Sequence, residues 1–149
     1  MSSAMPSQDE DGLAREVGEA MFAHDTASKA LGMSIEEIRP GYARLSMLVR
    51  ADMLNGLGSC HGGMMFALCD SAFAFACNSR NQATVAAGCS IEFLAPVAPG
   101  SRLTAVAQER VLAGRRGVYD VTLTDAQGQV VAVFSGKSAR VQGEVIGRA

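Results

Sequence analysis

Asp70 is the residue of this sequence whose type and surroundings point most directly to chemistry. It is the only charged residue between Gly63 and Cys77, and its neighbours in that segment are mostly apolar, including Phe66 and Phe73. Burying a lone carboxylate costs several kcal/mol unless it is paired, hydrogen-bonded or protonated. Such an expensive ionisable group is a common mark of a functional site. The alternative is an Asp that faces a subunit interface or bonds to a backbone group.

A glycine-rich loop, NGLGSCHGG at residues 55–63, leads directly into the segment that holds Asp70. Helix N-termini have free N–H donors and partial positive charge, and glycine lets a substrate oxygen approach the backbone. We therefore expect an oxyanion hole where the loop meets the helix, with Gly63 as a substrate contact. A plain tight turn is the alternative. His61 is either a donor to a carbonyl or a structural group that orients the loop.

The surrounding sequence predicts the elements that position these residues. Residues 1–11 are small and polar and predict a disordered tail, and helical spacing of apolar residues follows over 13–31 until Gly32. Alternating apolar residues predict a hairpin of strands at 35–39 and 42–50. The long apolar run over 62–78 predicts a buried helix. Short turns then separate four segments that predict an antiparallel meander, at residues 84–94, 103–111, 118–124 and 130–141.

This order of elements predicts the fold class. An apolar helix inserted among antiparallel strands must be covered by those strands, because nothing else in the chain can hide its surface. We therefore expect an α+β fold in which a curved antiparallel sheet wraps around one long central helix. The chain has 149 residues, which suits one domain over residues 12–149.

Composition excludes several classes of partner. Lys and Arg number 13 against 15 Asp and Glu, so no broad basic footprint predicts binding to nucleic acid or to a membrane surface. Neither a membrane span nor a secretory signal is visible, and the expected compartment is the cytoplasm. The cysteines form no CxxC pair, so we expect four free, buried thiols and no metal site; they are Cys60, Cys69, Cys77 and Cys89.

The pattern N-G-x-G-x-C-H-G-G, followed by A-x-x-D-S-A-F-A-F-A-C-N, resembles the PaaI-type branch of the hot-dog thioesterases, enzymes of the phenylacetyl-CoA pathway. The similarity runs over residues 21–141 and includes AGCSIEFLAP at 87–96. It implies a hot-dog fold, hydrolysis of an acyl-CoA thioester with no cofactor, and a homotetramer built as a dimer of dimers with active sites at the dimer interface. Leu57 departs from the pattern, since such enzymes frequently have His there, which puts a polar contact from this position in doubt.

The resemblance also assigns roles to individual residues. Asp70 matches the nucleophile or general base, and Gly62 matches the oxyanion-hole amide. Asn55 and His61 match polar groups that orient water and thioester. Residues of the strand after the helix are expected to contact the acyl group across the interface, the candidates being Thr84, Gly88 and Ser90. Basic residues could meet the phosphates of CoA, either Arg115 and Arg116 or Lys137 and Arg140.

Helix geometry restricts how Gly62 and Asp70 can cooperate. Eight residues separate them, and a rise of 1.5 Å per residue places them about 12 Å apart along the axis. Either one of them is uninvolved, or the site combines Gly62 of one chain with Asp70 of another, and the resemblance favours the second arrangement. The resemblance also points to phenylacetyl-CoA or its ring-hydroxylated derivatives as substrate. Two alternatives remain: a hot-dog hydratase or dehydratase, and a protein that binds acyl-CoA without turning it over.

Overall fold

The computed structural model describes residues 5–147, and its first element is a longer helix than the sequence predicts. Helix α1 spans Met5–His24, so residues 5–11 are helical and the prediction of a disordered tail is wrong for them. Residues 1–4 of that predicted tail lie outside the described residues. The helical spacing of apolar residues begins only at Leu13 because the preceding turn is exposed, with Asp9 and Glu10 in solvent.

The predicted single helix over residues 13–31 is broken at Asp25. Helix α1 ends at His24, and a short helix α2 covers Thr26–Ala30. Asp25 caps α2, because its Oδ1 accepts a hydrogen bond of 2.9 Å from the Ser28 amide. An Asp in this position satisfies an N–H that would otherwise have no partner, so it starts a new helix where the apolar periodicity alone predicts continuation.

Six strands form one antiparallel sheet in the order β1-β2-β4-β5-β6-β3. Their bounds are Ser34–Arg39 (β1), Tyr42–Leu48 (β2), Thr84–Phe93 (β3), Arg102–Ala113 (β4), Arg116–Thr124 (β5) and Val130–Arg140 (β6). The predicted hairpin is present as β1 and β2. The predicted four-stranded meander is wrong in its first strand, because β3 pairs with β6 and not with β4. Residues 94–101 therefore cross from one edge strand to the interior of the sheet, and Val97 is buried on the way.

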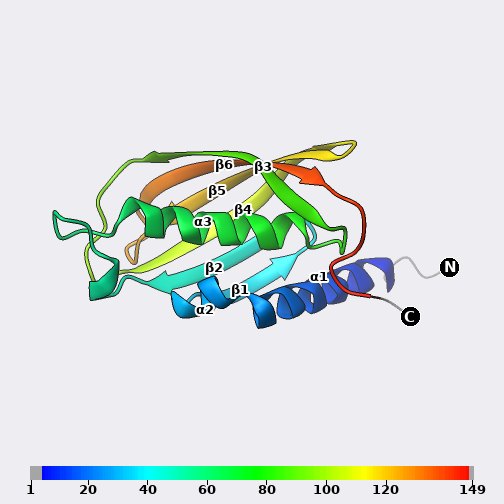
Figure 1. The fold of residues 1–149 in the computed structure, drawn as a ribbon, viewed down its shortest axis with the longest axis horizontal. Coiled ribbons are helices and arrows are strands. Elements are labelled where there is room, and N and C mark those ends of the chain that lie inside the picture. Colours follow the sequence, from blue (N-terminus) through cyan, green and yellow to red (C-terminus); the bar gives the residue numbers. More distant parts are fainter. Residues whose placement is uncertain (1–4, 148–149) are drawn as a thin grey trace.

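Helix α3, Gly62–Cys77, lies in the concave face of this sheet, which curls around it (Figure 1). One side of the helix is buried against the strands and supplies much of the core, namely Met65, Leu68, Cys69, Ala72, Phe73, Phe75 and Ala76. The Phe73 ring packs against Tyr119 with centroids 5.5 Å apart. A Cβ built on Gly136 of β6 would lie 2.7 Å from that ring, so the strand passes the helix closely only because the side chain is absent. The short 3-10 helix Ala51–Met53 connects β2 to the loop before α3.

The opposite side of α3 and the neighbouring strand β3 are less covered. No residue of β3 is buried, and the sheet order leaves its outer edge unpaired. Exposed apolar side chains gather at this edge, with Val85, Phe93 and Leu94 each at least half exposed. Unpaired and apolar strand edges associate readily with other strands. The predicted complete burial of the central helix is therefore only half achieved within one chain.

Candidate active site

The start of α3 has one backbone amide that no part of the described chain uses. His61 is the N-cap residue, and its Nδ1 accepts a hydrogen bond of 2.9 Å from the Gly63 amide. The Met64 amide donates to the His61 carbonyl at 2.9 Å. Gly62 N–H has no acceptor among residues 5–147, which is the state expected of a first-turn amide without a capping side chain. The predicted oxyanion donor at Gly62 is thus available, whereas the Gly63 amide is already engaged.

Asn55 organises the loop that precedes the helix. Its Oδ1 accepts hydrogen bonds from the amides of Leu57 at 2.9 Å and Ser59 at 3.2 Å, and its backbone amide donates to the Ser59 carbonyl at 2.7 Å. These contacts close a tight turn in which Leu57 is 93% exposed. Asn55 therefore holds the loop in shape, and His61 caps the helix. Both side chains thus bond to the backbone that leads into α3.

A pocket of about 420 Å³ opens beside that amide. It is lined by Asn55, Ser59, Cys60, Gly62, Met65 and residues 93–96. Phe93 forms one wall, since a Cβ on Gly62 would lie 3.1 Å from the tip of its ring. Phe93 was not among the residues predicted from the sequence, although an aromatic residue at the end of an apolar edge strand is a signal that could have found it. The pocket combines an apolar wall with a free N–H donor, as a site for an acyl group requires.

Asp70 lies two turns further along α3 and does not line this pocket. Its side chain is half-buried, and it receives no hydrogen bond from the described residues. Burial raises the pKa of the Asp70 carboxyl, and the nearby charge of Asp25 raises it further. The Cys89 thiol of β3 is close enough that its own pKa is raised, first by burial and then by the Asp70 charge. Asp70 is thus a carboxyl with an elevated proton affinity and no fixed partner, as suits an acid–base group.

One chain does not bring Gly62 and Asp70 together at a single carbonyl. Gly62 is the first residue of α3, and Asp70 lies eight positions later in the same continuous helix. This separation is about 12 Å along the helix axis. Gly62 lies at the level of Phe93 and Asp70 at the level of Cys89, because β3 runs antiparallel to the helix. The structure therefore has two separate candidate half-sites, one at Gly62 and one at Asp70.

Comparison with known proteins relates this surface to a family. The model of the Thioesterase superfamily matches residues 57–132, which include most of the loop, α3 and strands β3, β4 and β5. The chain belongs to the thioesterase superfamily. It is 48% identical over 130 residues to the acyl-coenzyme A thioesterase PaaI of Escherichia coli strain K12, an alignment that covers 87% of this chain and 93% of that relative.

Solved structures of thioesterase-superfamily proteins share the fold. The E. coli PaaI protein from the phenylacetic acid degradation operon superposes with a TM-score of 0.89 at 46% identity, covering 90% of this chain and 97% of that one. A mutant of the phenylacetic acid degradation protein PaaI from Thermus thermophilus gives a TM-score of 0.76 at 38% identity, over 78% of this chain and 100% of that one. The predicted α+β hot-dog fold is confirmed.

The three acyl-contact candidates on β3 do not lie together in this thioesterase chain. Thr84 is at the C-terminal end of α3, where its amide donates to Asn78 Oδ1 at 2.9 Å. Gly88 lies at a bulge of the strand, with open space around it. Ser90 faces the outer side of the sheet, away from α3 and Asp70. Of the three, Ser90 is therefore directed away from the half-site on its own chain.

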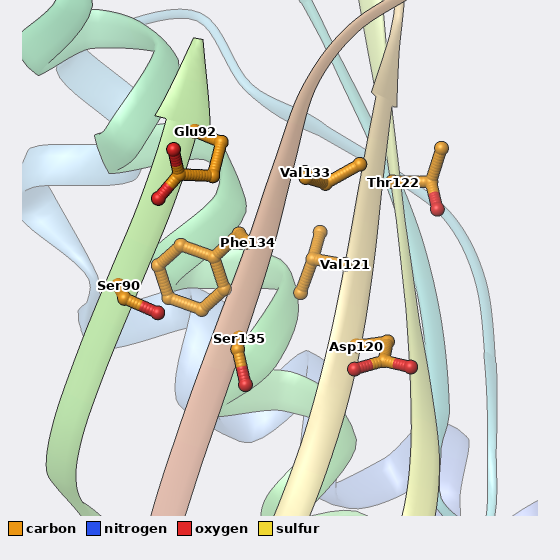
Figure 2. Close-up of a pocket in the computed structure, with 8 residues that line it drawn as sticks. All are labelled: Ser90, Glu92, Asp120, Val121, Thr122, Val133, Phe134 and Ser135. Carbon is orange, nitrogen blue, oxygen red and sulfur yellow. The ribbon is translucent and has the colours of Figure 1, made fainter.

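Ser90 belongs to a hollow of about 310 Å³ on that outer face. Figure 2 shows Ser90, Ser135 and Asp120 side by side on β3, β6 and β5. Phe134 and Val121 are the buried neighbours of Ser135 and Asp120 along β6 and β5, and they pack toward the helix. Because successive side chains on a strand point to opposite faces, Ser135 and Asp120 must point away from the helix. This hollow is separate from the half-sites at α3.

The predicted CoA-phosphate residues lie at the far end of the helix. Arg115 and Arg116 are exposed in and after the turn between β4 and β5, and the Arg140 amide donates to the Arg115 carbonyl at 2.7 Å. Arg140 also donates to Gln82 Oε1 at 2.8 Å. Neither Arg115 nor Arg116 forms an ion pair with the described part of the chain. They are available to an anion, but on one chain they lie at the opposite end of α3 from Gly62.

All four cysteines are free. Cys60 and Cys69 are buried, Cys77 is half-buried and Cys89 is exposed, so the prediction of buried thiols is wrong for Cys89. Over residues 5–147, no three His, Cys, Asp or Glu side chains are grouped as ligands of a metal ion. Among the helices described, none is long and apolar enough to cross a membrane.

Proposed function

We propose that this protein hydrolyses acyl-CoA thioesters to a free acid and CoA. The observation that carries the proposal is the Gly62 N–H at the N-terminus of α3, which has no acceptor among the described residues and opens to a partly apolar pocket. The chain that holds it belongs to the thioesterase superfamily. A thioester hydrolase needs a donor for the oxyanion that develops on the acyl carbonyl. It also needs a base or nucleophile, and Asp70 supplies a carboxylate that no other side chain of the described residues holds.

The chemical step assigns each group one task. Asp70 removes a proton from water as the water oxygen attacks the acyl carbon, and the carbonyl oxygen becomes an oxyanion that accepts from Gly62 N–H. The carbon–sulfur bond then breaks, and the thiolate of CoA takes the proton back from Asp70, leaving free acid, free thiol and an unchanged enzyme. Direct attack by Asp70 to give an anhydride is the second route to the same products.

We further propose that the complete site forms between two copies of the chain. The outer edge of β3 is unpaired, and a second β3 can pair with it antiparallel over residues 89–93, which continues the sheet and covers the exposed Phe93. Gly62 lies at the level of Phe93, and Asp70 lies at the level of Cys89. An axis of two-fold symmetry near Ile91 sets Phe93 of one copy opposite Cys89 of the other. That arrangement places the Gly62 amide across the interface from Asp70 of the second copy.

The same pairing supports roles for the remaining predicted residues. It moves the C-terminal end of α3 in one copy toward the Gly62 pocket of the other, and with it Thr84, Arg115 and Arg116. The arginines then offer charge to the phosphates of CoA, while Thr84 and Gly88 approach the acyl group. Assembly of two such dimers into a tetramer is part of the proposal and rests on the family resemblance.

Phenylacetyl-CoA and its ring-hydroxylated derivatives are the acyl groups that we propose. E. coli PaaI, the relative at 48% identity, comes from a phenylacetic acid degradation operon. The aromatic wall formed by Phe93, with Met65 beside it, suits a flat ring. A reducing compartment such as the cytoplasm suits the four free thiols.

The test is release of free thiol from a panel of aryl and aliphatic acyl-CoAs. Phenylacetyl-type thioesters are expected to have a higher kcat/KM than linear acyl-CoAs of similar size. Equal or faster hydrolysis of medium-chain aliphatic thioesters would contradict the choice of acyl group. A change at the acyl double bond without thiol release would point to a hydratase, and binding without turnover would point to a sensor.

A further inference from the structure

A chain of partly buried hydrogen bonds connects a second acidic residue to the neighbour of Asp70. Asp25 Oδ1 accepts from the Ser28 amide at 2.9 Å, and Asp25 Oδ2 accepts from the Ser28 hydroxyl at 2.7 Å. The Ser28 oxygen is also 2.8 Å from the Ser71 hydroxyl oxygen. Ser28, at the centre of the chain, is 2% exposed. Ser71 follows Asp70 directly on α3, and it is half-buried.

The direction of every hydrogen in this chain follows from counting donors. A serine hydroxyl has one hydrogen to donate and two lone pairs that accept. Ser28 gives its hydrogen to the Asp25 carboxylate, so it must accept in its bond with Ser71. Ser71 therefore donates to Ser28, and the free side of the Ser71 oxygen offers only lone pairs. Asp25 thus determines, through Ser28, that the remaining hydrogen-bonding capacity of the Ser71 oxygen is that of an acceptor.

We propose that Asp25 and Ser28 are positioning residues, which hold the Ser71 hydroxyl so that its oxygen accepts one hydrogen of the water that Asp70 deprotonates. This inference rests on the proposed hydrolysis at Asp70. The attacking water has two hydrogens, and it is oriented when each meets an acceptor, the Asp70 carboxylate and the Ser71 oxygen. A lone pair of the water is then directed at the acyl carbon, which lowers the entropy cost of attack. A direct nucleophilic attack by Asp70 would not need this acceptor in the first step.

The charges around Asp70 agree with this assignment. Asp25 faces it from the turn between α1 and α2, and the thiols of Cys69 and Cys77 on α3 and Cys89 on β3 complete its titratable surroundings. Burial and the Asp25 charge both raise the pKa of Asp70, and no cation among the described residues opposes them. Asp25 therefore has two effects on the proposed base: it orients the water acceptor, and it strengthens the base.

Two substitutions separate these effects. Asp25→Asn keeps the cap on α2, because the side-chain oxygen of the new asparagine still accepts a hydrogen bond from the backbone N–H of Ser28. The side-chain nitrogen of the asparagine then lies against the Ser28 hydroxyl. That nitrogen donates, so Ser28 must turn its hydrogen to Ser71, and Ser71 then directs its own hydrogen toward Asp70. Ser28→Ala removes the orienting contact but leaves the Asp25 charge in place. Ser46→Ala is the matched control, since Ser46 is equally buried at 3% exposed and bonds to Glu36 Oε1 at 3.0 Å on the outer side of β2.

The experiment measures thiol release against pH for the folded full-length variants, alongside wild type and Asp70→Asn. We expect Asp25→Asn and Ser28→Ala each to lower kcat by about tenfold with little change in KM, and Ser46→Ala to keep wild-type kcat. Only Asp25→Asn should also move the acid limb of the kcat/KM profile to lower pH, because a like charge is removed and a donor is turned to the carboxylate. Loss of the Asp25 charge alone would move that limb in Asp25→Asn and leave the kcat of Ser28→Ala at the wild-type value, which would overturn the positioning role.

The outcomes distinguish this inference from the proposed function. If wild type is active, Asp70→Asn is inactive, and both Asp25→Asn and Ser28→Ala retain wild-type kcat and pH profile, the positioning role is wrong and hydrolysis at Asp70 stands. If wild type releases no thiol from any acyl-CoA, the proposed function itself fails. Should Asp25→Asn not fold, Ser28→Ala decides on kcat alone, and a wild-type value overturns the inference.

Discussion

The Nδ1 atom of His61 accepts a hydrogen bond of 2.9 Å from the Gly63 amide, and this contact determines which amide of α3 is free to donate to a substrate. A helix begins with several N–H groups that have no partner within the helix. Here a capping side chain takes the second of them, and the first, on Gly62, is left open to the pocket beside Phe93. Within the described residues, Gly62 N–H is therefore the one amide in the first turn of α3 that is free to donate to an oxyanion.

Gly62→Pro tests that donor without disturbing the helix. Proline at the first helical position removes only an N–H that the helix does not use, and His61 already has the extended backbone (φ −61°, ψ 133°) that precedes proline readily. We expect kcat to fall by about 100-fold or more. Gly62→Ala is the control, because it adds a similar Cβ near Phe93 and keeps the N–H, and it should retain most of the activity. A proline variant within threefold of the alanine variant would contradict the assignment.

Asp70→Asn should lower kcat by at least about 100-fold with little change in KM, because the substitution preserves size and removes the base. In wild type, the acid limb of the kcat/KM profile should lie above the ordinary pKa of an Asp, since burial and the Asp25 charge raise the pKa of Asp70. Thiol release measured across pH reports both quantities. A folded variant with more than about a tenth of wild-type kcat would exclude Asp70 as the base.

The same substitution should stabilise the folded protein at neutral pH. The folded state raises the pKa of Asp70, so it binds the proton more tightly than the unfolded state does. Stability therefore falls as pH rises from the ordinary Asp pKa through the raised one, and Asp70→Asn removes that loss. We expect Tm of the variant to exceed that of wild type near pH 7, and the difference to vanish below the ordinary Asp pKa. A variant less stable than wild type at neutral pH would show that partners of the folded state favour the ionised carboxylate.

Gly136→Ala tests the close approach of β6 to the central helix. Its Cβ would lie 2.7 Å from the buried Phe73 ring, which cannot move without displacing Tyr119. Overpacking of this kind costs about 1–3 kcal/mol in unfolding free energy. Gly56→Ala is the control, since nothing lies within 4 Å of its Cβ. Equal denaturant midpoints for the two variants would mean that the helix does not rest on Gly136 as described.

Local patterns predicted most of the elements, and their failures are physical ones. The run over 62–78 predicts α3 because its length favours a buried helix, and alternation predicts β1 and β2. The start of α1 was missed because an exposed turn carries no apolar periodicity, and the break at Asp25 was missed because a cap interrupts a helix without changing that periodicity. The pairing of β3 with β6 depends on how the chain crosses the sheet between residues 94 and 101, which no local pattern predicts.

The site was predicted in its residues but not in its contacts. Asp70 and Gly62 follow from residue type, position and resemblance. The contacts depend on side-chain rotamers, which the sequence does not indicate. His61 accepts a hydrogen bond from the Gly63 amide, and the Asn55 side chain bonds within the loop. The Asp25–Ser28–Ser71 chain joins a helix cap to a residue 43 or more positions away, so no spacing in the sequence indicates it.

The most direct test of the shared site mixes two inactive variants, Gly62→Pro and Asp70→Asn, by denaturing and refolding them together and measuring phenylacetyl-CoA hydrolysis. A mixed dimer holds one site with an intact Gly62 from one chain and an intact Asp70 from the other, and one site with both defects. Random pairing makes half of the dimers mixed, so activity should recover to about a quarter of wild type by two-fold symmetry. If mixed dimers are shown to form and activity stays at the level of the separate variants, each site is built within one chain and the two-copy site is wrong.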